Sequence, residues 1–197
     1  MERVTTAAAT DRELVARLQR GEEAAFAELV TRHQGRALNV AYHVLRDHAD
    51  ATEVAQDAFV NIYRNIGTFR GDSEFTTWLH QIVLNLARNK HRWWKRRGRQ
   101  TTVSLDAPHE TSAGPVTRDV ASPTDAPDRA AVKAELIQQI SAAMTRLPPK
   151  FREVLVLRNV EDLSYDQIAA VLRCSVGTVK SRIARAREAL RAEWSRD

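Results

Sequence analysis

The sequence predicts an all-α protein made of two small helical domains joined by a flexible linker. Proline and glycine are scarce, at six and seven of 197 residues, and alternating apolar and polar runs are almost absent. Four of the six prolines lie between Pro108 and Pro127, in a stretch that has few large apolar residues and cannot bury enough surface to fold alone. We therefore expect one domain at residues 10–97, a linker at 98–129 and a second domain at 130–194.

The first domain contains four predicted helices. Thr10 and Glu13 have the spacing of a capping box at the start of the first helix. A second helical stretch opens near Phe26. Asp50 is the expected N-cap of a third helix, in which apolar residues recur in steps of three and four over four turns. A fourth helix runs from about Phe75 into a strongly basic segment.

The second domain ends in the pattern of a DNA-binding helix-turn-helix. Pro148 ends one helix, and Pro149 suits the first turn of the next. Ser164 and Gln167 form a second capping box that starts a short helix. Ser175 then caps a long basic helix. A short helix, a tight turn and a basic helix are the parts of a helix-turn-helix.

The last helix separates an apolar face from a basic one. At about 100° per residue, four apolar residues face the core: Val179, Ile183, Ala186 and Leu190. The outward face and its flanks hold small and basic residues: Gly177, Thr178, Lys180, Ser181, Arg182, Ala184, Arg185 and Arg187. Small residues let a helix enter the major groove, and Arg and Lys pair with guanine edges or phosphates. The alternative is an ordinary surface helix with solubilising arginines.

Positive charge is gathered in two separate segments. Residues 88–99 hold seven basic and no acidic residues, interleaved with Trp93 and Trp94, and residues 173–197 have a net charge of +4. Two separated basic segments indicate two contacts with a polyanion, and aromatic rings among cations suit nucleic acid. The preceding polar loop, residues 67–74, is compatible with holding an extruded base. Alternatively, the tryptophans pack on the first domain and the cations are merely solvated.

Other classes of protein fit poorly. No apolar run is long enough to span a bilayer, and the N-terminus lacks the apolar core of a signal peptide, so we expect a cytoplasmic protein. Cys174 is the single cysteine, and the histidines show no ligand spacing with Asp, Glu or Cys, so we expect no metal site and no cofactor. A nuclease or another enzyme needs clustered carboxylates or a metal site, so we expect that the protein is not an enzyme.

Two runs of sequence resemble extracytoplasmic-function sigma factors. The run ATEVAQDAFVNIYRNIGTFRGDSEFTTWLHQIVLNLARN resembles their region 2, and LPPKFREVLVLRNVEDLSYDQIAAVLRCSVGTVKSRIARAREAL resembles their region 4. The two runs occur in the family's order, with a linker of fitting length between them. The resemblance extends from about Asp11 to Leu190.

The resemblance implies a protein that binds core RNA polymerase, directs it to promoter DNA and assists melting, commonly under the control of an anti-sigma factor. For polymerase binding it implies Glu53, Gln56 and Asp57. For the −10 element it implies Arg70, Asp72 and Ser73 in a base-capturing loop, and His80, Asn85 and Arg88 on the helix that follows. For the −35 element it implies Thr178, Lys180, Ser181 and Arg185.

One residue departs from the usual pattern, and one rival function remains. Arg173 stands where helix-turn-helix sequences often carry glycine, and a left-handed turn there costs about 1 kcal/mol with a side chain, so we expect a differently shaped turn. The rival is a helix-turn-helix regulator that acts without being a polymerase subunit. This rival function gives no role to Glu53, Gln56 and Asp57.

Overall fold

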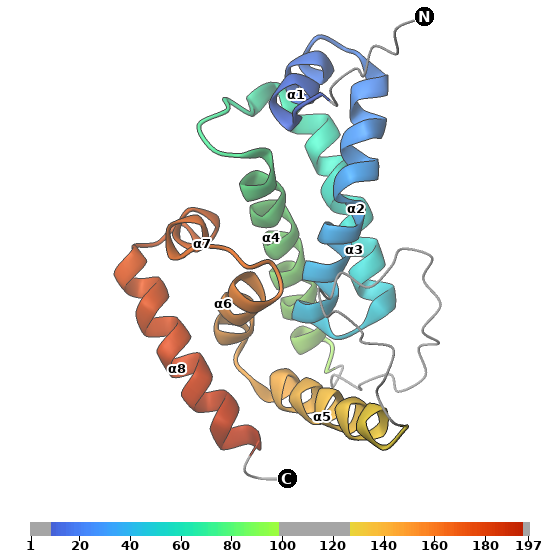
Figure 1. The fold of residues 1–197 in the computed structure, drawn as a ribbon. Coiled ribbons are helices and arrows are strands. Elements are labelled where there is room, and N and C mark those ends of the chain that lie inside the picture. Colours follow the sequence, from blue (N-terminus) through green and yellow to red (C-terminus); the bar gives the residue numbers. More distant parts are fainter. Residues whose placement is uncertain (1–8, 99–126, 195–197) are drawn as a thin grey trace, which may run out of the picture.

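The computed structural model describes residues 9–98 and 127–194, and all regular structure within them is helical (Figure 1). The all-α prediction is therefore confirmed. In chain order the helices are α1 (Asp11–Gln19), α2 (Glu23–Leu45), α3 (His48–Asn65), the short 3-10 helix η1 (Ile66–Thr68), α4 (Phe75–Arg96), α5 (Pro127–Arg146), α6 (Pro149–Asn159), α7 (Tyr165–Leu172) and α8 (Val176–Trp194).

The N-terminal unit is a bundle in which α2, α3 and α4 pack on one another and α1 packs against one end of α2 (Figure 1). Its fully buried side chains come from all three long helices and include Leu29, Leu45, Ile62, Leu79 and Val83. These residues recur at helical spacing within each helix, so a single apolar stripe per helix builds the core.

The start of α1 is as predicted, and the start of α3 is not. Thr10 Oγ1 accepts a hydrogen bond from the Glu13 backbone at 3.3 Å, and the Glu13 carboxylate accepts one from the Thr10 backbone at 2.7 Å. The N-cap of α3 is Asp47, whose carboxylate accepts from the Asp50 backbone at 2.9 Å. Asp50 lies one turn inside the helix and instead pairs with Lys90. The prediction of Asp50 as the cap was wrong because two aspartates three residues apart both fit the pattern.

The C-terminal unit consists of α5 to α8. Its first helix begins at Pro127, within the segment predicted as linker, and residues 99–126 of that segment lie outside the described residues. Pro149 occupies the first turn of α6, as predicted. The capping box of α7 is also confirmed, since Ser164 Oγ accepts from the Gln167 backbone at 3.2 Å and Gln167 Oε1 accepts from the Ser164 backbone at 2.8 Å.

The two units pack directly on one another. In Figure 1, α6 lies between α8 and the N-terminal bundle, where it contacts α2, while α7 contacts α4. Six consecutive residues of α6, Arg152–Leu157, are buried, so this helix is enclosed on all sides rather than along one stripe. None of the helices in the described parts of the chain is long and apolar enough to cross a membrane.

Candidate nucleic-acid and polymerase interfaces

The turn between α7 and α8 is left-handed despite its arginine. Arg173 has φ 51° and ψ 51°, and the next residue, Cys174, donates its backbone N–H to the Ala169 carbonyl at 3.0 Å. The expectation of a differently shaped turn was therefore wrong. The guanidinium of Arg173 donates to Gln81 Oε1 on α4 at 3.0 Å, a contact that offsets part of the strain of a left-handed residue with a side chain.

Local hydrogen bonds fix the start of α8. Ser175 Oγ accepts from the Thr178 backbone at 3.2 Å, which confirms the predicted cap. The Thr178 hydroxyl lies 2.9 Å from Ser175 Oγ, and the Ser181 hydroxyl donates to the Thr178 carbonyl at 3.0 Å. Both hydroxyls proposed to face DNA are thus held in place by the helix terminus itself.

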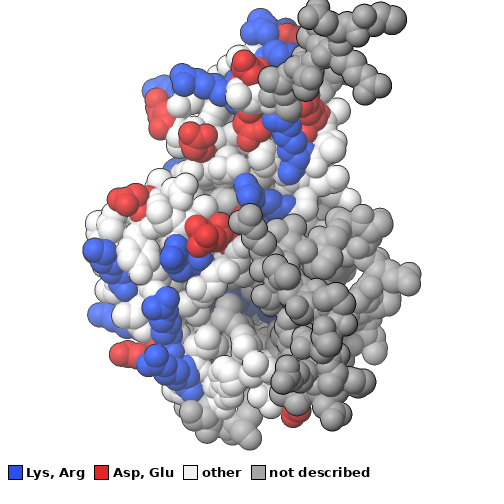
Figure 2. All heavy atoms as spheres, viewed as in Figure 1, with Lys and Arg blue, Asp and Glu red and all other residues white. Residues whose placement is uncertain are grey.

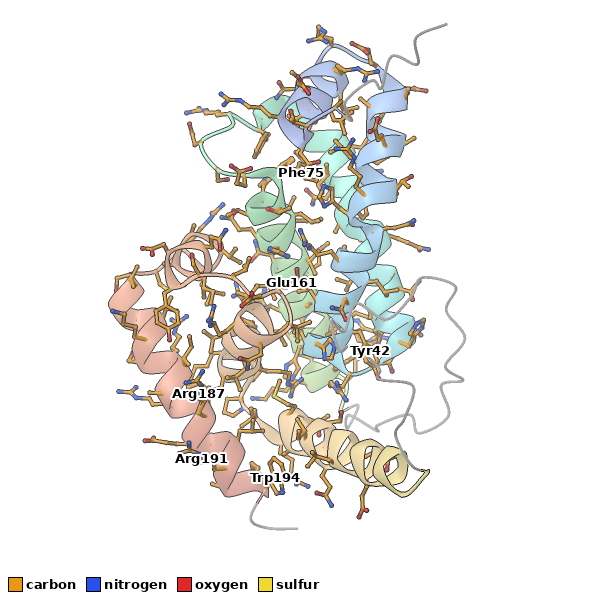
Figure 3. All side chains as sticks on the ribbon, viewed as in Figure 1. Tyr42, Phe75, Glu161, Arg187, Arg191 and Trp194 are labelled. Carbon is orange, nitrogen blue, oxygen red and sulfur yellow. The ribbon has the colours of Figure 1, made fainter. Side chains whose placement is uncertain are left out.

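The remaining residues of α8 divide as the sequence predicts. Val179, Ile183 and Ala186 are buried against the rest of the C-terminal unit, and Leu190 is half-buried against the same core. The side chains expected to meet DNA are all exposed or half-buried: Thr178, Lys180, Ser181, Arg182, Arg185 and Arg187. Figure 2 shows Lys and Arg side chains predominating along the edge formed by α7 and α8, whereas both signs mix around α1. Arg187 and Arg191, labelled on α8 in Figure 3, are both exposed.

The loop between η1 and α4 presents three of the predicted −10 residues. Arg70, Asp72 and Ser73 are all exposed. The loop is anchored at its base because Phe69 stacks on Trp78 with ring centroids 4.8 Å apart. The Gln19 amide, which the sequence analysis did not single out, donates to the carbonyls of Ile66 and Phe69 at 2.9 and 2.8 Å. These contacts hold the loop base while its polar tip stays in solvent.

The three predicted −10 residues on α4 differ sharply in exposure. Asn85 is exposed and its side-chain oxygen accepts from Arg88 Nη1 at 3.2 Å. The Arg88 side chain is 39% exposed, and that of His80 is 1% exposed. The buried His80 Nδ1 has no hydrogen-bond partner among the described residues. A buried nitrogen without a hydrogen-bond partner makes the folded protein less stable.

Acidic side chains of the C-terminal unit cover this face of α4. Glu153 of α6 binds Arg88 through two bonds, Nε to Oε1 at 2.8 Å and Nη2 to Oε2 at 2.6 Å. The hydrogen bond to this carboxylate raises the pKa of Arg88. Glu161, which follows α6, lies 3.2 Å from His80 Nε2 and 3.0 Å from Arg36 Nε. Figure 3 shows the labelled Glu161 where α6 meets the N-terminal bundle.

The two tryptophans of the basic segment have different surroundings. Trp94 is buried in the core, which agrees with the packing alternative. Trp93 is exposed, and the Arg97 guanidinium and the Lys90 ammonium lie 4.4 and 5.7 Å from its ring centroid. Of these two tryptophans, Trp93 is the one that presents its ring, flanked by cations, at the surface.

The predicted polymerase-binding residues share one exposed face of α3. Glu53, Gln56 and Asp57 are exposed, whereas the opposite side of the helix is buried in the bundle. Lys90 Nζ lies 2.5 Å from the Glu53 carboxylate and 2.9 Å from that of Asp50, so Glu53 is tied to α4. The sequence analysis missed this link.

The contacts between the two units were also missed. Glu153 and Glu161 lie 65 and 81 residues from their partners on α4, so no local pattern connects them. The sequence does hold one signal: in α6 the adjacent Arg152 and Glu153 directly precede the apolar run Val154–Leu157. Adjacent charges that a helix buries must find partners elsewhere in the fold. In the described residues there is no cluster of His, Cys, Asp or Glu suited to a metal ion.

Comparison with known proteins matches both halves of the chain. Residues 29–100 match the family described as Sigma-70 region 2, and residues 137–190 match that described as Sigma-70, region 4. The RNA polymerase sigma-H factor of Pseudomonas aeruginosa is 39% identical over 91% of each chain. The ECF RNA polymerase sigma-E factor of Escherichia coli K12 is 36% identical over 92% of each chain.

Solved structures agree with these matches. CnrH, in complex with the cytosolic domain of CnrY, has a TM-score of 0.67 at 30% identity and covers 95% of this chain and 98% of its own. The sigma factor RpoE of Bartonella quintana, in complex with the anti-sigma factor NepR, shares the fold with a TM-score of 0.63 at 22% identity. The chain therefore belongs to the extracytoplasmic-function sigma factors of the sigma-70 family.

Proposed function

We propose that this sigma factor binds core RNA polymerase through α3, reads the −10 element with the loop before α4 and with α4 itself, and reads the −35 element with α8. As a sigma factor it is a transcription initiation factor and not an enzyme. The observation that carries the assignment of surfaces is the helix-turn-helix, whose exposed face holds Lys180 and Arg185 over a buried apolar face. A basic helix presented in this way suits the major groove.

The polymerase contact is assigned to the exposed face of α3, in particular to Gln56 and Asp57. This face distinguishes a polymerase subunit from a regulator that acts alone, because the latter has no need of it. We place the protein in the cytoplasm, where polymerase and promoter are found. An anti-sigma factor is a further expected partner, since the structural relatives include sigma factors solved with such proteins.

Run-off transcription with core polymerase over a promoter library tests the function. We expect specific transcripts that require the chain, and a shared −10 and −35 sequence among the selected promoters. DNA binding by the chain with no transcripts, and no co-purification with core polymerase, would favour the independent regulator instead.

Charge reversal on α3 tests the polymerase contact. Asp57→Lys changes an exposed residue and leaves the Lys90–Glu53 ion pair in place. We expect weaker retention of core polymerase in a pull-down, by roughly tenfold, since like charges placed in an interface cost on the order of 1–2 kcal/mol or more. Glu135→Lys, an equal charge change at an exposed residue of α5, is the matched control. Equal retention of core by both variants contradicts the assignment to α3.

A further inference from the structure

Gln19 links helix α1 to the base of the loop that precedes α4. Its side-chain amide donates one hydrogen bond to the Ile66 carbonyl at 2.9 Å and one to the Phe69 carbonyl at 2.8 Å. The first carbonyl lies at the start of η1 and the second directly after its end. Both donors of one amide group therefore hold a segment that lies 47 to 50 residues away in the sequence.

The bond to Phe69 acts on the peptide unit that leads into the exposed tip of the loop. A carbonyl and the N–H that follows it belong to one rigid plane, so fixing the Phe69 carbonyl also fixes the direction of the Arg70 N–H. After Arg70 the chain turns at Gly71, whose φ of 76° favours glycine. Arg70, which is proposed to take part in base capture, thus lies between a fixed peptide plane and a left-handed glycine.

Trp78 of α4 contacts both ends of the loop. Phe69, before the tip, stacks on Trp78 with ring centroids 4.8 Å apart, and Phe75, after it, meets the same ring at a steep angle with centroids 6.3 Å apart. The residues between them, 70–74, are all exposed. Ring contacts of this kind fix where the loop base lies, whereas the hydrogen bonds from Gln19 fix the direction in which its carbonyls point.

Gln19 contributes to the loop and not to the hydrophobic core. It is the last residue of α1 and is exposed, while the buried residues of that helix are Leu14, Val15 and Leu18. Exposed carbonyls that lose a protein donor are hydrated by water, so the loss costs the bundle little stability. Substitution of Gln19 should therefore change the order of the loop more than the stability of the protein.

We infer that Gln19 is a positioning residue for recognition of the −10 element: through the Phe69–Arg70 peptide it holds the loop in the shape that captures a base. A loop already held in its binding shape loses less conformational entropy when it takes up the base. Contacts with the phosphates carry no sequence information, so they do not depend on this shape to the same degree. The inference rests on the proposed role of the loop and adds α1 to the elements that set base recognition.

Two substitutions separate the hydrogen-bond donors of Gln19 from its size. Gln19→Met keeps an unbranched side chain of similar length and removes both donors, whereas Gln19→Lys keeps N–H donors on a flexible side chain. Gln34→Met, the same exchange at an exposed glutamine of α2, is the matched control. The added charge of Gln19→Lys should raise the affinity for all DNA probes alike, and a ratio of two affinities cancels that effect.

The measurement uses the holoenzyme and fluorescein-labelled non-template −10 strands of a promoter that it selects. Each −10 base in turn is replaced by an abasic site, and fluorescence anisotropy gives the ratio of affinities for the intact and the abasic strand. In the wild type we expect one position, the captured base, to have the largest ratio. Gln19→Met should lower that ratio about fivefold, as expected for the loss of about one hydrogen bond, and leave the other ratios unchanged. Gln19→Lys should restore most of it, and Gln34→Met should match the wild type.

The other outcomes separate this inference from the proposed function. A wild-type ratio retained by Gln19→Met at the captured base would overturn the inference alone. Equal losses at every position together with a lower melting temperature, or a Gln19→Lys variant that behaves like Gln19→Met, would also overturn it, because they indicate a purely structural side chain. A wild-type series without any dominant position would instead count against base capture by the loop, and the inference would fall with that proposal.

Discussion

The helices α8 and α4 both carry side chains proposed to read DNA, and they present them differently. On α8, Lys180 and Arg185 stand in solvent, on a face set by a local cap and turn. On α4, Arg88 and His80 are engaged by carboxylates from the other unit. One of the two proposed DNA-reading surfaces is open to solvent in the structure, and the other is partly covered by a long-range contact.

Because of this difference, we expect substitutions on the two surfaces to have different effects. On α8 the side chains proposed to read DNA are exposed, so substitutions there should alter the preferred DNA sequence. The covered face of α4 is controlled by how tightly the units hold together, so substitutions around it should alter stability and availability.

Low pH should lower the free energy of unfolding, and we expect His43 to account for the effect. Burial, and after it the neighbouring Arg46, lowers the pKa of His43 to about 4. His43 lies on α2, which contacts α6. An unfolded histidine takes up a proton near pH 6.5 and the folded one only near pH 4, so the unfolded state binds more protons between these values. The free energy of unfolding should fall by up to about 3 kcal/mol from this group as the pH drops through that window.

Urea unfolding at pH 7, 6, 5 and 4.5 measures the effect. His43→Gln should flatten the pH dependence relative to wild type across this range. Parallel pH profiles for the two proteins would mean that His43 does not carry the acid sensitivity.

Substitutions on the exposed face of α8 should change which DNA sequence the protein prefers. Arg185→Ala should relax the preference at one or two adjacent −35 positions, because a bidentate base contact contributes about 1–3 kcal/mol of discrimination. Arg187→Ala should weaken binding to all sequences alike, as expected for a phosphate contact. Selection from a randomised promoter library by each holoenzyme measures both. A sequence logo unchanged by Arg185→Ala would assign this residue to the backbone and transfer base reading toward Lys180 and Ser181.

The smallest expected effect lies at Arg173, where the two surfaces meet. Arg173→Gly relieves the left-handed strain but removes the hydrogen bond to Gln81. The strain is about 1 kcal/mol, and an exposed hydrogen bond of this kind contributes less, so the variant should be slightly more stable. Thermal unfolding measures the change. A lower melting temperature would show that the contact with α4 outweighs the strain.

Local features of this fold could be predicted from the sequence because their causes lie within a few residues. The capping boxes at Thr10 and Ser164 and the cap at Ser175 each depend on a partner three residues away. The same logic failed at Asp50, where a second aspartate one turn earlier supplies the cap. At Arg173 it failed for another reason, since the helix-turn-helix keeps its left-handed turn and tolerates the strain.

The partners of the polar face of α4 could not be predicted from local sequence. Helical spacing predicts which face of α4 points inward, but not which side chains of another unit will oppose its polar face. Glu153 and Glu161 meet α4 only because α6 packs against the first bundle, and that packing depends on the whole buried surface of α6. The exposed residues of α3 were predictable as polar, and their assignment to polymerase stays a prediction.

Arg152 has a further consequence for how the two units part. Three of its four hydrogen bonds go to carbonyls within its own unit, those of Met144, Thr145 and Leu147, and one goes to Val44. The bonds that close the end of α5 therefore lie within the C-terminal unit, whereas a single carbonyl of α2 depends on this arginine. Loss of the Val44 contact alone would leave the three bonds at the end of α5 in place.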